Sequence, residues 1–419
     1  MEKLLITAEN VLPISSPPLI KGSILIVDGK IKEIGKASKL KKKYQGMPTL
    51  ELGDGILLPG FVNAHTHLEL GWIGKRIGKF SGFISWLKQI IKARMADTTR
   101  EEIETSVEEG IKMLLQCGVT TIGEISSYGG LDKPLLKKSG MRTVLFSELF
   151  DWHGDFWEIF SFDKDETFEE RPFPHATYSC SPEFLKKVWR FNHQRGIPLG
   201  IHLAESPDEV KFLRGEVNDF EKKIFPLIGK EPFVRDKSDT PFQYLKGLKF
   251  FNGTKVTAVH MVQILPEEVE EINKHDIGIV LCPRSNFYLK VGAPPLKYLA
   301  DLERIGIGTD GLSSNFNLDF FEELRFFCLT FGKKLGKKAP FFTIYLATLG
   351  GARALFLDER IGSIDKGKEA DLIFLSPKNP FPDPYLSVIS CCKEDVKLVI
   401  VKGKVVSSKT EIPVNINDY

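Results

Sequence analysis

The strongest constraint on the fold of this chain is an alternation of short apolar runs with longer amphipathic segments, repeated from about Ile56 to about Phe356. VTTIGEIS and IPLGIHLAE are typical apolar runs, and TTREEIETSVEEGIKMLLQCG and SPEFLKKVWRFNHQRG are typical amphipathic segments. The first kind predicts buried strands and the second predicts helices, so their order indicates parallel βα units. We therefore predict an α/β protein built on a (β/α)8 TIM barrel, with a doubly wound open sheet as the alternative.

Both ends of the chain have the pattern of β-structure. Residues 1–55 contain short apolar runs and a hairpin signal at Asp28-Gly29, and the last part of the chain has Val-rich runs on either side of Lys402-Gly403. We expect the two ends to form one small β-sandwich domain, with residues 1–55 and 366–419 contributing its two parts. Residues 56–365 then form the barrel.

Composition narrows the classes of partner. Charged residues make up 27% of the chain and the formal net charge is +2, so there is no broad electrostatic attraction to nucleic acid or to an acidic membrane. The six cysteines form no C-x-x-C pair, which favours reduced thiols, and no uncharged run approaches the length of a bilayer span. We expect a soluble, cytoplasmic protein that acts on a small molecule.

Two histidines one residue apart suggest a metal site. His65 and His67 follow an apolar run in ILLPGFVNAHTHLEL, and residues i and i+2 of a strand point to the same side. Two neutral imidazoles that face one point are a typical chelate, and the carboxyl end of a barrel strand is where such enzymes carry their active sites. The alternative is a pair of surface histidines in a loop.

Other groups that can bind metals recur at the ends of later apolar runs. His202 ends IPLGIHLAE, His260 ends KVTAVH, and Asp310 ends RIGIGTD. His65, His67, His202 and Asp310 supply the ligands of a catalytic zinc site, which leaves His260 for another task. The remaining histidines, His153, His193 and His275, are expected to be structural or exposed.

Glu205 follows His202 by three residues and should lie just beyond the strand end. A carboxylate beside a metal-activated water can carry a proton to a leaving group. The alternative is a helix-start carboxylate that interacts with the segment SPDEVKFLRG.

These motifs together resemble the amidohydrolase superfamily, in its branch of cytosine, guanine and nucleoside deaminases and triazine chlorohydrolases. LLPGFVNAHTHLE, HLAES, IGIGTDGLSSN and GARALFLDERIGSIDKGKEADLIFL are similar to its segments and stand in the same order. The resemblance implies one divalent metal ion, zinc or iron, held by His65, His67, His202 and Asp310. It implies that Glu205 shuttles protons, that His260 orients the attacking water, and that Asp310 accepts a proton from that water.

The substrate-binding residues follow from weaker similarities. PHATYSCSPE resembles a family motif with a substrate-binding histidine, here His175, although Thr177 replaces the usual proline. HTHLELGWIGKRIGKFSGFISWLKQI and LFSELFDWHG resemble the aminofutalosine deaminases of an alternative menaquinone pathway, which adds Glu69, Trp86 and Glu148 as substrate-binding candidates. Glu69 could instead hold a metal-binding histidine, and the helix of Trp86 could simply pack on the barrel.

Several alternatives to this substrate remain open. They are an S-adenosylhomocysteine or methylthioadenosine deaminase, a guanine deaminase, and a triazine chlorohydrolase. A catalytically silent scaffold of the same fold is the alternative from another class, and the complete ligand set disfavours it. A homodimer is an expectation from the family alone.

Overall fold

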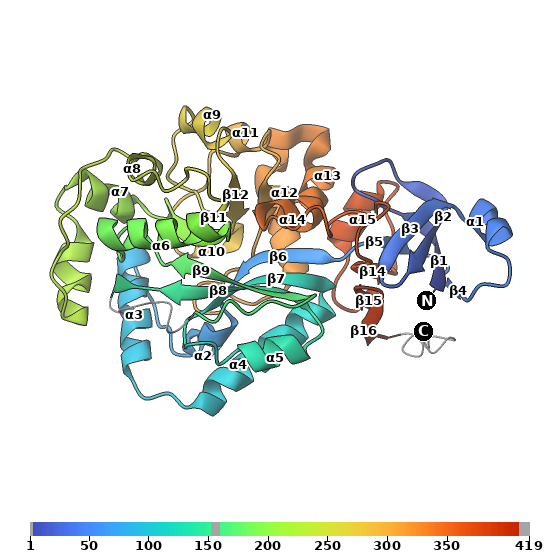
Figure 1. Ribbon diagram of the computed structural model, residues 1–419, viewed down its shortest axis with the longest axis horizontal. Helices are drawn as coiled ribbons and strands as arrows, with labels where there is room; N and C mark the ends of the chain where they lie inside the picture. The colour runs from blue at the N-terminus through green and yellow to red at the C-terminus, as the bar shows by residue number, and fades with distance from the viewer. Residues whose placement is uncertain (1–2, 152–159, 410–419) are drawn as a thin grey trace.

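The computed structural model describes residues 3–151 and 160–409, and it is elongated, with two parts of unequal size (Figure 1). The smaller part joins both ends of the chain. Within the described residues, eight strands form one sheet in the order β16-β15-β14-β5-β1-β2-β3, with β4 paired to β1. Their bounds are β1 Lys3–Val11, β2 Leu19–Val27, β3 Lys30–Lys36, β4 Thr49–Glu51, β5 Ile56–Pro59, β14 Leu372–Leu375, β15 Val396–Val401 and β16 Lys404–Ser408.

The two predicted hairpins are present in this sheet. Asp28 and Gly29 have φ of 48° and 74° and join the antiparallel strands β2 and β3, and Lys402 and Gly403, with φ of 51° and 78°, join β15 and β16. Two consecutive residues with positive φ match the right-handed twist of the strands, which is why such turns close tight hairpins.

Two expectations for the small domain need correction. Its strands are hydrogen-bonded into a single sheet among the described residues, so it is not a sandwich of two separate sheets. Ile56–Pro59, assigned from the sequence to the barrel, pairs as β5 with β1 and β14 of the small sheet. A short run buried on both faces carries no mark of the sheet it joins, because either location buries it equally.

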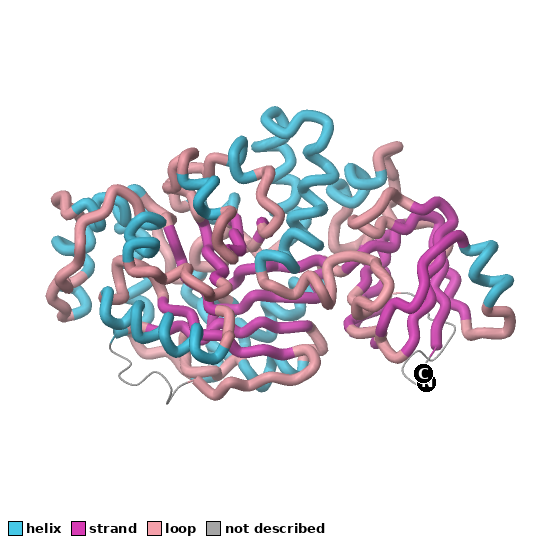
Figure 2. The backbone as a smooth tube through the Cα atoms, turned by 45° about the horizontal axis from the view of Figure 1, so that its top comes forward, coloured by secondary structure: helices cyan, strands magenta, loops and turns pink. Residues whose placement is uncertain are grey.

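The larger part contains parallel strands, seen as the central magenta strands of Figure 2. Over the described ranges, β6-β7-β8-β9 and β10-β11-β12-β13 form two four-stranded sheets, and every adjacent pair is parallel. Their bounds are β6 Phe61–Thr66, β7 Val119–Ser126, β8 Arg142–Leu149, β9 Phe168–Pro174, β10 Leu199–Leu203, β11 Val256–His260, β12 Ile277–Leu281 and β13 Ile305–Ile307. A parallel bridge from Ala176 to His202 joins the sheets at one side, and the Asp310 N–H donates to the His65 carbonyl at the other.

Helices connect and cover these strands, as the alternation of the sequence predicts. The α-helices are α1 Ala37–Lys43, α2 Gly71–Gly74, α3 Phe83–Met95, α4 Arg100–Gln116, α5 Lys133–Lys138, α6 Pro182–Arg195, α7 Pro207–Arg214, α8 Pro241–Gly247, α9 Glu268–Ile272, α10 Pro283–Tyr288, α11 Leu296–Leu299, α12 Phe320–Leu335, α13 Ala339–Tyr345, α14 Gly351–Ala354 and α15 Pro384–Ser390. Local signals set their ends: Ser181 caps α6 and Gly196 ends it in the left-handed conformation. Over the described part of the chain, none of these helices is both long and apolar enough to span a membrane.

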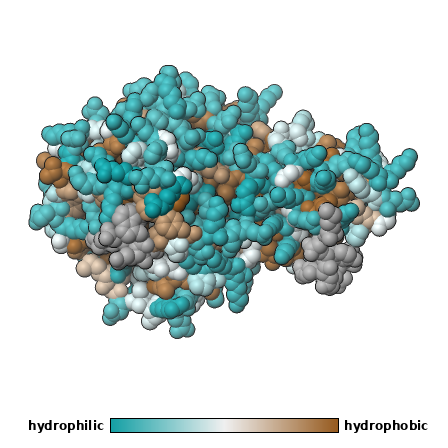
Figure 3. Space-filling view, viewed as in Figure 1, coloured by the Kyte–Doolittle hydropathy of each residue, from teal (hydrophilic) through white to brown (hydrophobic). Residues whose placement is uncertain are grey.

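An apolar cluster packs the strands of both parallel sheets against the segment that follows α14. Val62, Phe146 and Val259 from the strands pack there with Leu355 and Ile361. Polar side chains gather instead at the carboxyl ends of the strands, where His65 and His260 lie. Outside, the face shown in Figure 3 is largely hydrophilic, with small apolar areas.

A buried ion pair ties the two parts together. The guanidinium of Arg142, at the start of β8, is 2% exposed and lies 2.8 Å from a carboxylate oxygen of Asp371 and 2.5 Å from one of Glu369. Both acids precede β14 of the small sheet. We expect Arg142→Ala to lower the free energy of unfolding by about 3 kcal/mol, because it removes the buried cation that pairs with Asp371 and leaves Glu369 with Arg360 alone.

Chemical denaturation of wild type and variant measures this loss. Arg100→Ala is the matched control, because Arg100 makes an exposed pair with Glu104 and should cost under about 0.5 kcal/mol. Equal stabilities of Arg142→Ala and Arg100→Ala would show that the buried pair does not hold the two parts together.

Candidate active site

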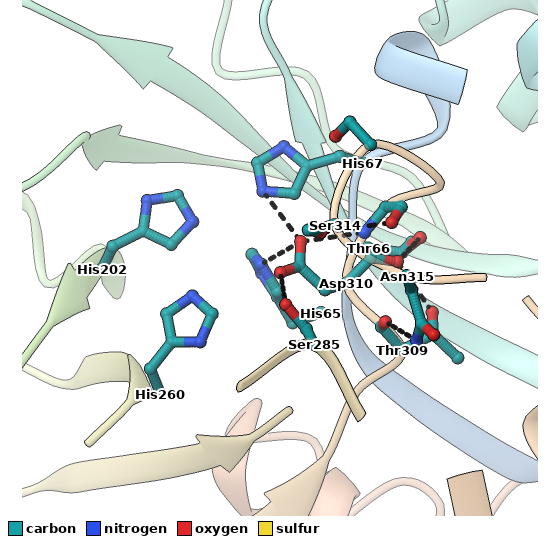
Figure 4. Close-up of polar contacts among 12 residues, drawn as sticks. His65, Thr66, His67, His202, His260, Ser285, Thr309, Asp310, Ser314 and Asn315 are labelled. Carbon is teal, nitrogen blue, oxygen red and sulfur yellow. Dashed lines mark hydrogen bonds and ion pairs between the residues drawn. The ribbon is translucent and has the colours of Figure 1, made fainter. Parts of the chain in front are cut away.

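The histidines singled out from the sequence meet at the carboxyl ends of the strands (Figure 4). His65 lies near the end of β6, and His67 follows that strand. His202 lies in β10, and His260 is the last residue of β11. The side-chain donor atoms of His65, His67 and Asp310 all lie within 4.8 Å of one another, and so do those of His65, His202 and His260. Four separate strands therefore deliver donors to one point, as their places at the strand ends predict.

Unpartnered nitrogens show that this cluster suits a metal ion. Both ring nitrogens of His65 and the Nδ1 of His67 are buried and have no hydrogen-bond partner among the residues that the structure describes. Burial and neighbouring His65 lower the pKa of His67 to about 3, and burial lowers the pKa of His202 well below its usual value. Both rings are therefore neutral, and each can offer a nitrogen lone pair to a metal ion. Buried donors without partners are costly unless another group binds them.

Hydrogen bonds outside the cluster orient its members. The Nδ1–H of His202 donates to the carbonyl of His175 at 3.1 Å, which leaves Nε2 for the cluster. The Asp310 carboxylate accepts from the Ser285 hydroxyl at 2.6 Å and from the Gly311 N–H at 2.8 Å, and its Oδ1 lies 3.7 Å from the Nε2 of both His65 and His67. These bonds orient the side chains of His202 and Asp310 toward the cluster.

Glu205 and His260 form a second pair beside the donors. A carboxylate oxygen of Glu205 lies 3.6 Å from the Nε2 of His260, whose Nδ1–H donates to Asn286 Oδ1 at 3.0 Å. Burial, together with the negative charges of Asp310 and Glu209, raises the pKa of Glu205 well above its usual value. A raised pKa keeps a carboxyl group protonated to higher pH, which favours a role as a general acid.

These groups open into a cavity of about 360 Å³. His67, His202, Glu205, His260 and Asp310 line one end of it. Trp86, Glu148 and His175, the substrate-binding candidates, also line it. Apolar side chains line much of the rest, among them Ile90, Ile91 and Met95 of α3 together with Phe225, Ile228 and Phe233.

The substrate-binding candidates form a connected polar wall. Glu148 is 6% exposed, its Oε1 lies 3.8 Å from His175 Nε2, and Arg94 reaches its Oε2 at 3.4 Å. The Nδ1 of His175 lies 2.7 Å from the Ser179 hydroxyl, and the Trp86 indole N–H donates to the Ser313 carbonyl at 2.6 Å. The side chains of Glu148, His175 and Trp86 are therefore held in place by neighbouring groups.

Glu69, predicted as a substrate-binding candidate, does not line the cavity, and its carboxylate faces the loop after β7. Its side chain is fully buried, and its carboxylate accepts hydrogen bonds from the backbone N–H groups of Ser127, Tyr128 and Asp132 at 2.6, 2.9 and 3.3 Å. The backbone turns into a 3-10 helix at Leu68–Leu70, so Glu69 points into the loop after β7 and not along the direction of His65 and His67.

A loop-holding role for Glu69 has a measurable consequence. Glu69→Ala should lower the free energy of unfolding by about 3 kcal/mol, because it leaves buried N–H groups without acceptors, while the KM of active enzyme stays near the wild-type value. Denaturation curves and steady-state kinetics on the same preparation separate the two effects. A large increase in KM at unchanged stability would restore the substrate-binding role.

The structure also adds residues that the sequence did not reveal. Arg94 and Tyr178 line the cavity, and Ser285 and Asn286 bond to Asp310 and His260. Arg94 stands in no pattern that separates it from ordinary helix residues, whereas Tyr178 lies in PHATYSCSPE beside His175. Ser285 and Asn286 lie in CPRSNFYLKVGAPPL, so their place after a strand was the available signal. His193 and His275 are not among the residues that line the cavity, and His153 is outside the described residues.

Parallel strands with clustered histidines, an aspartate and a buried acid–histidine pair define the class of metal-dependent hydrolases. The sequence model of the amidohydrolase family matches residues 56–406. The chain belongs to the amidohydrolase family, as the motifs predict, and is a hydrolase that acts on carbon–nitrogen bonds other than peptide bonds.

Individual relatives agree with this assignment over nearly the whole chain. It is 29% identical to a 5-methylthioadenosine/S-adenosylhomocysteine deaminase of Moorella thermoacetica, over 98% of this chain and 96% of the relative. The structure matches Helicobacter pylori aminofutalosine deaminase in complex with methylthio-coformycin with a TM-score of 0.85 and 25% identity, covering 96% and 99% of the two chains. It matches a zinc-bound adenosine deaminase of Xanthomonas campestris with a TM-score of 0.81 and 25% identity, covering 96% and 92%.

Proposed function

We propose that this protein is a metal-dependent hydrolytic deaminase that removes an exocyclic amino group from a purine nucleoside. The observation that carries the proposal is the Glu205–His260 pair, 3.6 Å apart, which faces the same cavity as the metal-competent side chains of His67, His202 and Asp310. His65, His67, His202 and Asp310 would hold one divalent ion, zinc or iron. A silent scaffold would have no use for this set together with a proton-transfer pair.

The residues present account for each proton of the reaction. When bound, the metal supplies Lewis acidity that makes a water molecule nucleophilic near neutral pH. Asp310 accepts a proton from the attacking water, and His260 orients the oxygen that adds to the ring carbon. Glu205 protonates the ring nitrogen, recovers a proton from Asp310, and protonates the amino group. It then takes the hydroxyl proton of the adduct, which returns both carboxyl groups to their starting states. The C–N bond breaks, ammonia leaves, and the ring keeps the oxygen as a carbonyl.

We propose 6-amino-6-deoxyfutalosine, of the alternative menaquinone pathway, as the substrate. The aminofutalosine deaminase of Helicobacter pylori supports this choice, as does the apolar cavity wall formed by α3 and by Phe225, Ile228 and Phe233. That wall suits a bulky aryl substituent, because apolar surface is removed from water against it. The Moorella relative makes S-adenosylhomocysteine and methylthioadenosine the second candidates.

An ammonia-release screen tests both the proposed reaction and the proposed substrate. We expect activity on 6-aminopurine nucleosides and none on melamine, with kcat/KM for aminofutalosine at least about tenfold above that for S-adenosylhomocysteine. Heat-denatured enzyme provides the blank. A preference for S-adenosylhomocysteine or methylthioadenosine would overturn the substrate, and the absence of ammonia from every purine nucleoside would overturn the reaction.

We also propose that the two parallel sheets close into one eight-stranded barrel. The Ala176–His202 bridge and the bond from the Asp310 N–H to the His65 carbonyl, at 3.1 Å, support this closure at its two seams. Both seams involve residues of the candidate site. Closure would explain why donors from the first and last strands meet.

A further inference from the structure

The peptide unit between Ala204 and Glu205 is held at both ends. Its carbonyl accepts hydrogen bonds from the backbone N–H groups of Val262 and Gln263 at 2.9 and 2.8 Å, in the loop after β11. Its N–H donates to Glu209 Oε2 at 2.9 Å. Ala204 has a φ of 55°, in the left-handed region that a residue with a Cβ atom rarely adopts. This conformation persists only where its surroundings impose it.

Glu209, which holds the N–H end, is itself held by Thr177. Glu209 lies in the first turn of α7 and is fully buried, as is Thr177. The Thr177 hydroxyl donates to Glu209 Oε1 at 2.6 Å. Both carboxylate oxygens are therefore occupied, one by the loop after β9 and the other by the backbone of Glu205.

We propose that Thr177 and Glu209 are positioning residues that set the orientation of the Glu205 carboxylate through this peptide unit. The inference rests on the proposed function, in which Glu205 transfers protons. The Glu205 N–H is outside α7, so its bond to the Glu209 side chain is not a hydrogen bond of the helix backbone. That bond instead fixes the path of the chain between the end of β10 and the start of α7. Rotation of the peptide would move the Glu205 carboxylate away from His260, and proton transfer is sensitive to displacements of about 1 Å.

Thr177 joins the two segments that carry His175 and Glu205. Its hydroxyl donates to Glu209, which links the loop after β9 to the first turn of α7.

Removal of single groups tests the proposal. Thr177→Val should lower kcat about tenfold, and Glu209→Gln by about tenfold to a hundredfold, with KM and bound metal close to wild type in both. Thr177→Ser, which restores the hydroxyl, should restore kcat. Hydrogen–deuterium exchange of a peptide that contains Glu205 should be faster in Thr177→Val than in wild type, a readout independent of turnover.

Thr240→Val is the matched control. Thr240 is also buried and donates to a buried carboxylate, that of Glu268, which accepts the Leu265 N–H at 2.7 Å. This variant should lose stability and keep kcat, which shows that the loss of a buried threonine hydroxyl is not enough to slow the reaction.

Three results would overturn the inference. They are an unchanged kcat and exchange rate in Thr177→Val, an equal loss of kcat in Thr177→Ser, or an equal loss in Thr240→Val. Failure of the proposed function is seen separately, as the absence of ammonia release from every nucleoside by the wild-type enzyme.

Discussion

Glu205→Gln should lower kcat for ammonia release by about 10²- to 10⁴-fold, the usual contribution of a positioned acid–base group. Glutamine keeps the size and the buried position of Glu205, which is 5% exposed, but its amide cannot accept a proton and pass it to the leaving amine. KM should change little, because the shape of the cavity is preserved. Steady-state ammonia release, with metal content measured on the same sample, gives both numbers.

Glu183→Gln is the control for this substitution, since Glu183 is an exposed residue in the first turn of α6. It should match wild type in kcat, KM and bound metal. Normal ammonia release by Glu205→Gln would remove Glu205 from the mechanism, and loss of metal by that variant would mean that Glu205 is a ligand.

His202→Ala should weaken metal binding by at least about 100-fold, because it removes one donor from the centre of the cluster. The Nδ1 of His202 is already occupied by the His175 carbonyl, so its Nε2 is the atom that faces the other donors. Elemental analysis of purified protein should show metal in wild type and little in the variant. Activity should fall with the metal.

Thermal unfolding gives a second readout of this substitution. An ion that binds the folded state stabilises it by mass action, so a chelator should lower the Tm of wild type. The same chelator should leave the Tm of His202→Ala nearly unchanged. His193→Ala, at an exposed histidine of α6, should respond as wild type does. Undiminished metal in purified His202→Ala would refute the ligand assignment.

Much of the fold was predictable because its signals are local. Buried parallel strands are continuous apolar runs, amphipathic helices have a 3.6-residue period, and Asp28-Gly29 and Lys402-Gly403 permit tight turns. Family membership was predictable for the same reason, since its motifs are contiguous. The placement of Ile56–Pro59 was not predictable, because both strands that pair with β5, β1 and β14, are far from it in the sequence.

The residues of the candidate site were predictable only in part, for the same reason. His65, His67, His202, His260 and Asp310 could be selected because each ends a strand, and parallel strands bring their carboxyl ends together. Glu69 was named from a motif resemblance, which says nothing of where the side chain points after the backbone has turned at Leu68–Leu70. Its true partners, the N–H groups of residues 127–132, belong to the loop after β7.

The sequence by itself determined which residue types stand at the strand ends and hence the chemistry available there. Only the tertiary structure decided which buried groups support them. Asn286 accepts a hydrogen bond from His260, and Arg94 pairs with Glu148. Glu209, held by Thr177, accepts the backbone N–H of Glu205. The physical reason is that strand and helix periods record whether a side chain is buried, whereas a hydrogen bond between distant segments depends on how those segments pack. That information is present in no single stretch of the chain.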